Sequence, residues 1–202
     1  ITGRLEKGME ESGQAAMSYV RSRLDRLGLS EDHFHSVDVH VHFPEFVRKD
    51  GPSAGVTMVT AIASALMQAP VSRDVAMTGE ITLRGRVLPI GGLKEKLLAA
   101  HRAGLTTVIV PRVNRKDLRE IPRRVLKLLR LVLVDHVDDV LREALVLDDP
   151  DAVFGPPRTV IEFRKGELVV REGRAEVDGD GDDTGAPRPG VAPDLVEQPT
   201  GR

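Results

Sequence analysis

The chain is organised around a stretch that opens with Lys49-Asp50-Gly51-Pro52-Ser53-Ala54-Gly55 and closes with Gly91-Gly92-Leu93-Lys94-Glu95-Lys96-Leu97-Leu98-Ala99-Ala100. Gly51 and Pro52 predict a tight turn, and the run of small residues 54–69 predicts a helix that begins just after Ser53. A serine at a helix start lies beside free backbone N–H groups and the positive end of the helix dipole, which stabilise an oxyanion. We therefore expect Ser53 to be a nucleophile and Lys96 to be its base.

Composition limits the function classes. The 202 residues suffice for one domain of ordinary size and a tail. A net charge of -2, from 29 basic and 31 acidic residues, argues against a dedicated nucleic-acid or membrane-surface protein. The absence of cysteine excludes disulfides, a thiol nucleophile and a zinc–thiolate site. Because the sequence starts at Ile1 without a signal-peptide pattern, we expect a piece of something longer.

One uncharged segment has to be weighed as a membrane span, because no charged residue occurs between Asp50 and Arg73. Gly, Pro, Thr, Ser and Gln dilute its apolar residues, so the pattern favours a buried helix. We expect no membrane association.

The N-terminal part contains an apolar helical pattern over 9–27, stopped by Gly28, and then a period-two pattern over 37–43 that predicts a strand. His40 and His42 would share the polar face of that strand. Zinc needs a third protein ligand, and a solvated strand face explains both histidines equally well. A serine–histidine pair remains the more serious alternative to Lys96, because a histidine that reaches the Ser53 hydroxyl could be its base.

Residues 75–90 read as short strands punctuated by Gly79 and Gly85, as in a hairpin. Thr78 would lie at a strand end, where its hydroxyl could face a cleft. A threonine that merely fills a strand position is an equally weighted alternative, since β-branched residues favour strands.

The helix expected over 93–103, stopped by Gly104, distinguishes two lysines. Lys96 shares a stripe with Leu93, Leu97 and Ala100, whereas Lys94 points to the opposite side. Desolvation on an apolar stripe lowers the pKa of a lysine toward the range of a working general base. The alternative is a lysine that extends along the surface to solvent.

The rest of the chain alternates between strand and helix patterns, which predicts a mixed α/β core. Strands are expected over 107–110 and 131–134 and a helix over 137–147, and the basic run 112–130 is expected to be a solvated helix face. Segments 159–163 and 167–170 could form a small hairpin, and residues 173–202 have the composition of a disordered tail. The chain has no phosphate-binding Gly-Lys motif, so this piece is not a P-loop ATPase.

Several long motifs together resemble the proteolytic domain of Lon, the ATP-dependent protease. They are the Lys49–Gly55 stretch, Met77-Thr78-Gly79-Glu80-Ile81-Thr82-Leu83-Arg84-Gly85, and Val87-Leu88-Pro89-Ile90-Gly91-Gly92 followed by the Lys94–Lys96 helix. The resemblance spans residues 2–147, which gives a domain division of 1–147, an extension over 148–172 and the tail over 173–202.

The resemblance implies Ser53 as nucleophile, Lys96 rather than Lys94 as base, and Thr78 as the residue that holds the lysine. It implies an α+β fold of the ribosomal protein S5 domain 2-like type, with mixed sheets and flanking helices. It also implies a six-membered ring, polypeptide substrates, an AAA+ ATPase segment of the same chain that binds ATP and Mg, and a soluble bacterial or organellar type. We expect no cofactor in this piece, no nucleic-acid partner and a bacterial cytoplasmic location.

One departure from the family pattern precedes the nucleophile. The chain has Pro44-Glu45-Phe46-Val47-Arg48 where the family usually has a longer Pro-Glu-Gly-Ala-Thr-Pro segment. The altered loop leaves open an alternative in which the domain keeps its fold as an assembly module but has lost catalysis.

Overall fold

The computed structural model describes residues 1–3, 5–43, 51–155, 160–165 and 167–171. Its helices are α1 (Lys7–Arg21), α2 (Glu31–Ser36), α3 (Gly55–Met67), α4 (Leu93–Arg102), α5 (Arg123–Leu128), α6 (Val137–Ala144) and α7 (Pro150–Phe154), with 3-10 turns η1 (Pro52–Ala54) and η2 (Arg112–Glu120). Its strands are β1 (Thr2–Gly3), β2 (His42–Phe43), β3 (Val75–Met77), β4 (Glu80–Ile81), β5 (Val87–Leu88), β6 (Thr107–Pro111), β7 (Arg130–Val134), β8 (Val160–Arg164) and β9 (Glu167–Arg171).

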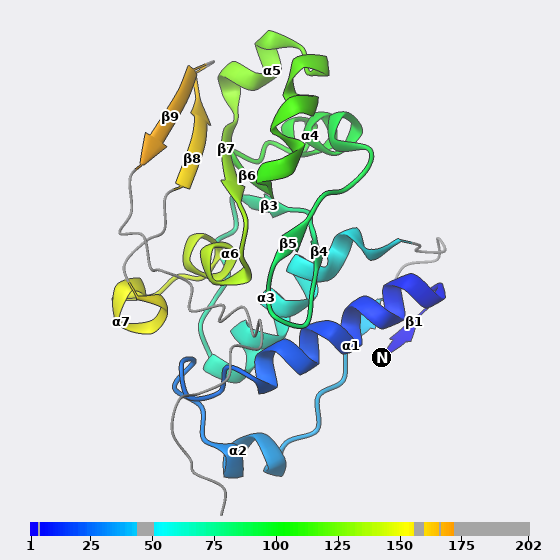
Figure 1. Ribbon diagram of the computed structural model, residues 1–202, viewed down its shortest axis with the longest axis vertical. Helices are drawn as coiled ribbons and strands as arrows, with labels where there is room; N and C mark the ends of the chain where they lie inside the picture. The colour runs from blue at the N-terminus through cyan, green and yellow to red at the C-terminus, as the bar shows by residue number, and fades with distance from the viewer. Residues whose placement is uncertain (4, 44–50, 156–159, 166, 172–202) are drawn as a thin grey trace, which may run out of the picture.

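The main sheet has five strands in the order β3-β6-β7-β8-β9 (Figure 1). Strands β3, β6 and β7 are parallel, whereas β7, β8 and β9 pair in antiparallel fashion. Two further pairs, β1–β2 and β4–β5, lie outside this sheet. The mixed sheet with flanking helices confirms the expected α+β architecture at this level.

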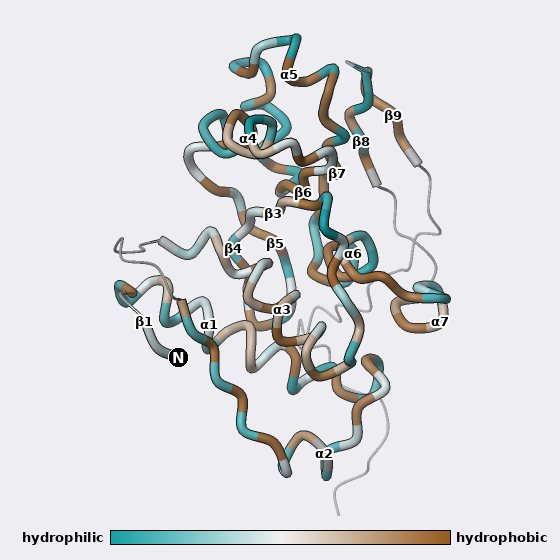
Figure 2. Tube along the Cα trace, turned by 180° about the vertical axis from the view of Figure 1, so that it is seen from behind, coloured by the Kyte–Doolittle hydropathy of each residue, from teal (hydrophilic) through white to brown (hydrophobic). Residues whose placement is uncertain are grey.

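Both faces of the central strands are buried, which explains their continuous apolar sequence. Along β6 and β7, Ile109 and Val132 face a core shared with α1, α3 and α6. Val108 and Leu131 face a second core with α4 and α5. Figure 2 shows hydrophobic colour along β6, where it lies between the two helical layers. The period-two alternation of a strand therefore assigns neighbouring side chains to different cores.

The strand expected over 37–43 is wrong for most of its length. Only His42–Phe43 forms a strand, because its partner β1 supplies just Thr2–Gly3. The alternation itself holds, since Val39 and Val41 pack against the core while His40 is exposed. The first helix is also shorter than expected: α1 ends at Arg21, and turns carry the chain to Gly28, whose φ is 69°.

The basic segment 112–130 is not one helix face. It consists of η2, α5 and the first residue of β7, and Pro122 separates the two helical parts because it has no N–H to donate to a continuous helix. Arg130 is not a solvated cation: it contacts the carboxylates of Glu143 and Glu162, the latter at 2.6 Å and fully buried.

The expected hairpin after residue 148 is confirmed as β8–β9, and it continues the main sheet by pairing with β7. Ile161 and Phe163 of β8 pack against the core formed with α4 and α5. The helix α6 ends at Ala144, three residues earlier than expected, and α7, capped by the Asp149 side chain, was not predicted. The expected tail over 173–202 and the altered loop Pro44–Arg48 lie outside the described residues.

The uncharged segment forms α3, which has only 13 residues and is largely buried. In the part of the chain that the structure describes, we find no helix with the length and hydrophobicity needed to span a bilayer.

Candidate active site

Ser53 lies in the 3-10 turn η1, immediately before α3. Gly51 precedes the turn with a φ of 83°, a value that suits glycine, and Pro52 starts it with a fixed φ. The helix α3 follows directly from Gly55, so the turn and helix together present Ser53, half-buried, at a helix start as the sequence predicted.

The segment Thr78-Gly79 holds this turn through its main chain. The Ser53 carbonyl oxygen accepts hydrogen bonds from the Gly79 N–H at 2.9 Å and from the Thr78 hydroxyl at 3.2 Å. The Val56 N–H donates to the Gly79 carbonyl at 3.1 Å. A β-carbon on Gly79 would lie 2.8 Å from Val87 and 2.9 Å from Val56, so only glycine allows this close approach.

Lys96 reaches the same point from α4. Its Nζ lies 2.8 Å from the Ser53 Oγ and 3.0 Å from the Thr78 Oγ1. On α4 the stripe predicted from the sequence is present, with Leu93, Leu97 and Ala100 buried, while Lys94 is exposed. The structure thus brings Ser53, Thr78 and Lys96 together from three separate elements.

The hydrogen bonds fix the direction in which protons can move. Thr78 donates its only hydroxyl hydrogen to the Ser53 carbonyl, so toward Lys96 it can only accept. When the Lys96 amine is neutral, it can donate one N–H to Thr78 and still has a lone pair that can accept the hydrogen of the Ser53 hydroxyl. The arrangement can therefore transfer a proton from Ser53 to a neutral Lys96.

The environment of Lys96 favours the neutral amine. Burial lowers the pKa of Lys96 below its ordinary value of 10.5 by desolvating the charged form. Among the described residues no carboxylate forms an ion pair with Lys96, so no opposite charge offsets this effect.

A pocket of about 450 Å³ opens beside the three residues. Its remaining lining consists of small or apolar side chains and one threonine: Ala54, Thr57, Ala76, Met77, Ala99, Ala100, Ala103, Leu105 and Val108. Among the described residues of this lining Lys96 is the sole ionisable one, so this part of the cavity suits an uncharged, apolar group next to the Ser53 hydroxyl.

The two histidines weighed as a metal site or as a rival base lie in another environment. The Thr2 hydroxyl lies 2.8 Å from Nε2 of His40 and 2.7 Å from Nδ1 of His42. Neither ring is part of the Ser53 pocket. Across the described ranges, no cluster of three or more metal-ligating side chains is found.

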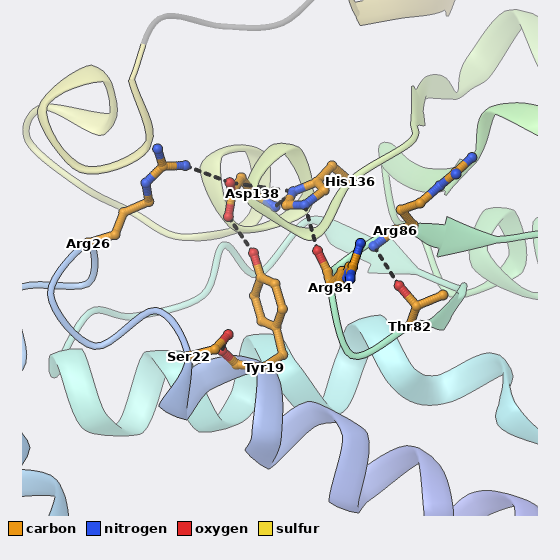
Figure 3. Close-up of polar contacts among 8 residues, drawn as sticks. All are labelled: Tyr19, Ser22, Arg26, Thr82, Arg84, Arg86, His136 and Asp138. Atoms are coloured by element: carbon orange, nitrogen blue, oxygen red, sulfur yellow. Dashed lines mark hydrogen bonds and ion pairs between the residues drawn. The ribbon is translucent and has the colours of Figure 1, made fainter. Parts of the chain in front are cut away.

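A buried polar network, which the sequence did not reveal, supports the segment that carries Thr78 and Gly79 (Figure 3). The Tyr19 hydroxyl of α1 donates to Asp138 at 2.5 Å, and Arg26 donates to the other oxygen of the same carboxylate at 2.9 Å. The pKa of Tyr19 is raised, first by burial and then by the Asp138 charge. Tyr19 and Asp138 are 119 positions apart, so no local pattern predicts their contact.

His136 connects this network to the β4–β5 hairpin. Its Nδ1 accepts the Asp138 N–H at 3.1 Å, which leaves Nε2 as the nitrogen that donates to the Arg84 carbonyl at 3.1 Å. The Val137 N–H donates to the Gly85 carbonyl at 2.8 Å. The turn of the hairpin is thus held by α6 and the residue before it, and Tyr19 of α1 holds α6 through Asp138. At the opposite end of the hairpin, Gly79 holds the turn that carries Ser53.

Comparison with known proteins gives consistent similarities. Residues 1–147 match the family model of the Lon protease (S16) C-terminal proteolytic domain. The chain is 77% identical over 170 residues to Lon protease 3 of Sorangium cellulosum (84% of this chain, 20% of that protein) and 62% identical over 160 residues to Lon protease 1 of Myxococcus xanthus (79% and 20%). It is 59% identical over 147 residues to Lon protease 1 of Bacillus subtilis (72% and 19%).

The chain spans about a fifth of the length of these curated relatives. The family model, by contrast, covers well over half of the chain. On this evidence the chain belongs to the S16 family of Lon serine proteases, as its C-terminal proteolytic domain.

Proposed function

We propose that this domain hydrolyses peptide bonds with Ser53 as nucleophile, Lys96 as general base and Thr78 as the residue that orients the lysine. The observation that supports this most directly is the 2.8 Å distance between the Lys96 amine and the Ser53 hydroxyl, in a site that desolvates the amine. Membership of a serine protease family agrees with that chemistry.

The reaction follows from the hydrogen bonds. Neutral Lys96 takes the hydroxyl proton while Ser53 Oγ attacks the peptide carbonyl carbon, and the carbonyl oxygen becomes an oxyanion. The Val56 N–H already donates to Gly79 and the Gly55 N–H to Pro52, so the helix-start donors proposed for the oxyanion are the N–H groups of Ser53 and Ala54. Protonated Lys96 then donates to the leaving amine, and water, deprotonated by Lys96, hydrolyses the acyl-enzyme.

The pocket supports a preference for apolar side chains next to the scissile bond. The described residues of its lining are small or apolar and uncharged apart from Lys96, and a charged side chain placed against them would be desolvated without a partner. The proposed substrates are short or unfolded polypeptides, which reach the pocket without prior unfolding.

The activity, the assembly and the ATPase segment of the whole protein are proposed from the family to which the domain belongs. We infer that the domain belongs to an ATP-dependent protease that degrades unfolded or misfolded proteins in the bacterial cytoplasm. It would act in a six-membered ring with an AAA+ segment of the same chain, and ATP and Mg would bind to that segment. We also propose the S5 domain 2-like fold type and the division into a proteolytic domain over 1–147, an extension over 148–172 and a tail over 173–202.

Cleavage of a short fluorogenic peptide tests the dyad. Ser53→Ala and Lys96→Ala are each expected to abolish cleavage, by about 10⁴-fold or more, because either loss removes the nucleophile or its activation. The matched controls are Lys94→Ala, on the exposed side of the same helix, and His42→Ala, the base of the rival hypothesis.

Two results would overturn the proposal. Turnover that survives in Lys96→Ala but is lost in His42→Ala would identify a serine–histidine pair. No serine-dependent cleavage at any protein concentration that allows ring assembly would identify the domain as a silent assembly module.

A further inference from the structure

A second, larger groove lies away from the Ser53 pocket, between η2, α5 and the β8–β9 hairpin. Its volume is about 1100 Å³. The two helical segments and the hairpin are neighbours in Figure 1, above and beside the strand β7. The ionisable residues of its lining, among those that the structure describes, are six cations and one anion: Arg115, Lys116, Arg119, Arg123, Lys127, Lys165 and Glu167.

The six cations have no carboxylate partner in the part of the chain that the structure describes. Several arginines elsewhere in the fold are paired, among them Arg26 with Asp138, Arg112 with Asp135 and Arg142 with Asp151. All six groove cations are exposed, so their positive charges add up over one concave surface. The groove therefore attracts a polyanion.

The floor of the groove is apolar. Leu118, Ile121 and Leu126 are buried there, Phe163 lies beside them, and Leu168 of β9 is 39% exposed at the edge. A phosphate backbone has no apolar group to bury against such a floor. A polypeptide that carries both carboxylates and an apolar side chain can contact the six cations and the floor at the same time. The surface favours an acidic peptide segment.

We propose that the groove binds the acidic segment 176–183 of this same chain. That segment reads Glu-Val-Asp-Gly-Asp-Gly-Asp-Asp, with five carboxylates, one valine and no basic residue. Its charge complements the six cations, and Val177 supplies a side chain for the apolar floor. This docking interaction is independent of the proposed peptide hydrolysis.

The connection is long enough. Glu167 and Leu168 line the groove and belong to β9, which ends at Arg171. From Leu168 to Arg171 the strand moves away by roughly 10 Å, at about 3.3 Å per residue. The next twelve residues, to Asp183, reach up to about 40 Å when extended, so the acidic segment can return to the groove without strain.

The test measures the distance between the segment and the groove in the full 202-residue chain. Because the chain has no cysteine, the pair Val113→Cys and Gly181→Cys can be labelled specifically for energy transfer. We expect a short-distance population at low salt that disappears near 1 M salt, where charges are screened beyond about 3 Å. An excess of unlabelled chain should leave the transfer unchanged, which distinguishes docking within one chain from docking between copies.

The double variant Arg123→Gln/Lys127→Gln should lower the docked-to-undocked ratio about fivefold, as expected from the loss of two exposed ion pairs. Arg102→Gln/Arg124→Gln is the matched control, because it removes the same charge from exposed positions outside the groove lining, one of them adjacent to Arg123. Reversing the groove charges with Arg123→Glu/Lys127→Glu should abolish docking, and Asp180→Lys/Asp182→Lys in the same chain should restore it.

An unchanged distance distribution in the Arg123→Gln/Lys127→Gln variant would overturn the proposal. It would also be overturned if the label pair stays far apart while a 20-nucleotide single-stranded DNA binds and loses affinity in that variant, because the occupant would then be a nucleic acid. Transfer that an excess of unlabelled chain abolishes would assign the occupant to a second copy.

Discussion

Two polar clusters lie at the two ends of the β4–β5 hairpin, one at its turn beside Arg84 and Gly85 and the other at Thr78, just before its first strand. They differ in how the charged group is paired. At one end, the Asp138 carboxylate receives Tyr19, Arg26 and a contact from His136. At the other end, the hydroxyls of Ser53 and Thr78 are the hydrogen-bond partners of the Lys96 amine among the described residues. The first cluster pairs its carboxylate with a cation, whereas the second has an amine with no anionic partner in the part of the chain that the structure describes.

The difference indicates which cluster stabilises the fold and which is prepared for chemistry. A carboxylate that is paired and hydrogen-bonded keeps its charge and fixes the elements around it. A desolvated amine without a counterion gives up its proton more readily, which a general base requires. Each cluster can be changed separately, so the comparison can be tested.

The largest expected effect separates activity from stability at Lys96. Lys96→Met should lower kcat/KM for a fluorogenic peptide by about 10⁴-fold or more. Its free energy of unfolding at neutral pH should not fall, since methionine keeps the apolar stem and removes a desolvated charge. Urea denaturation of Lys96→Met and Lys94→Met checks this, and a clearly destabilised Lys96→Met would show that the amine supports the fold.

The next effect concerns the paired cluster. Asp138→Ala should lower the free energy of unfolding by about 2–4 kcal/mol, because it leaves the Tyr19 hydroxyl and the Arg26 guanidinium without their shared acceptor. The control is Asp135→Ala, whose carboxylate is half exposed in its pair with Arg112 and should cost about 1 kcal/mol or less. Equal losses in the two variants would contradict the assignment of the buried cluster to stability.

A smaller effect is expected at Thr78. Thr78→Val keeps the shape of the side chain but removes the hydroxyl that accepts from Lys96 and donates to the Ser53 carbonyl. We expect kcat to fall about 10- to 100-fold with little change in KM, and Thr78→Ser to recover most of the loss. A valine variant with wild-type kcat would show that Thr78 only fills space in the connection between β3 and β4.

The smallest effect is a dependence of stability on pH. The pKa of Lys96 is lowered in the folded chain, so between that value and 10.5 the unfolded chain binds more protons than the folded one. The free energy of unfolding that depends on Lys96 is therefore lowest at neutral pH. It rises as the pH increases from the lowered pKa of Lys96 to 10.5. The difference in unfolding free energy between Lys96→Met and wild type should shrink over the same range, and activity should rise with pH as Lys96 becomes neutral.

The sequence predicted best where one period dominates a segment. The helix that carries Lys96 and the burial of Leu93, Leu97 and Ala100 followed from the 3.6-residue spacing. The prediction of a strand over 37–43 was wrong for most of its length, because alternation predicts which side chains are buried but not whether a partner strand is available. The prediction of one solvated helix face over 112–130 was wrong because Arg130 belongs to a strand and pairs with Glu162, 32 positions away.

The candidate site shows the same limit. Local patterns indicated a turn at Ser53 and a desolvated face at Lys96, but these residues are 43 positions apart and their contact depends on how α4 packs. Before the fold was known, their pairing as nucleophile and base was a hypothesis, which the resemblance to a family supported. Nothing in the sequence indicated that the basic residues of η2 and α5 would meet β9 around a groove, since that depends on the pairing of β8 with β7.

That pairing has a consequence for where the domain can be cut. The family match ends at Leu147, yet β8 covers one edge of β7 and places Ile161 and Phe163 on the core beneath α5. A protein shortened to the matched segment would expose the backbone of an inner strand to solvent and leave Arg130 without Glu162. The stretch that identifies the family is thus shorter than the stretch that folds as one sheet.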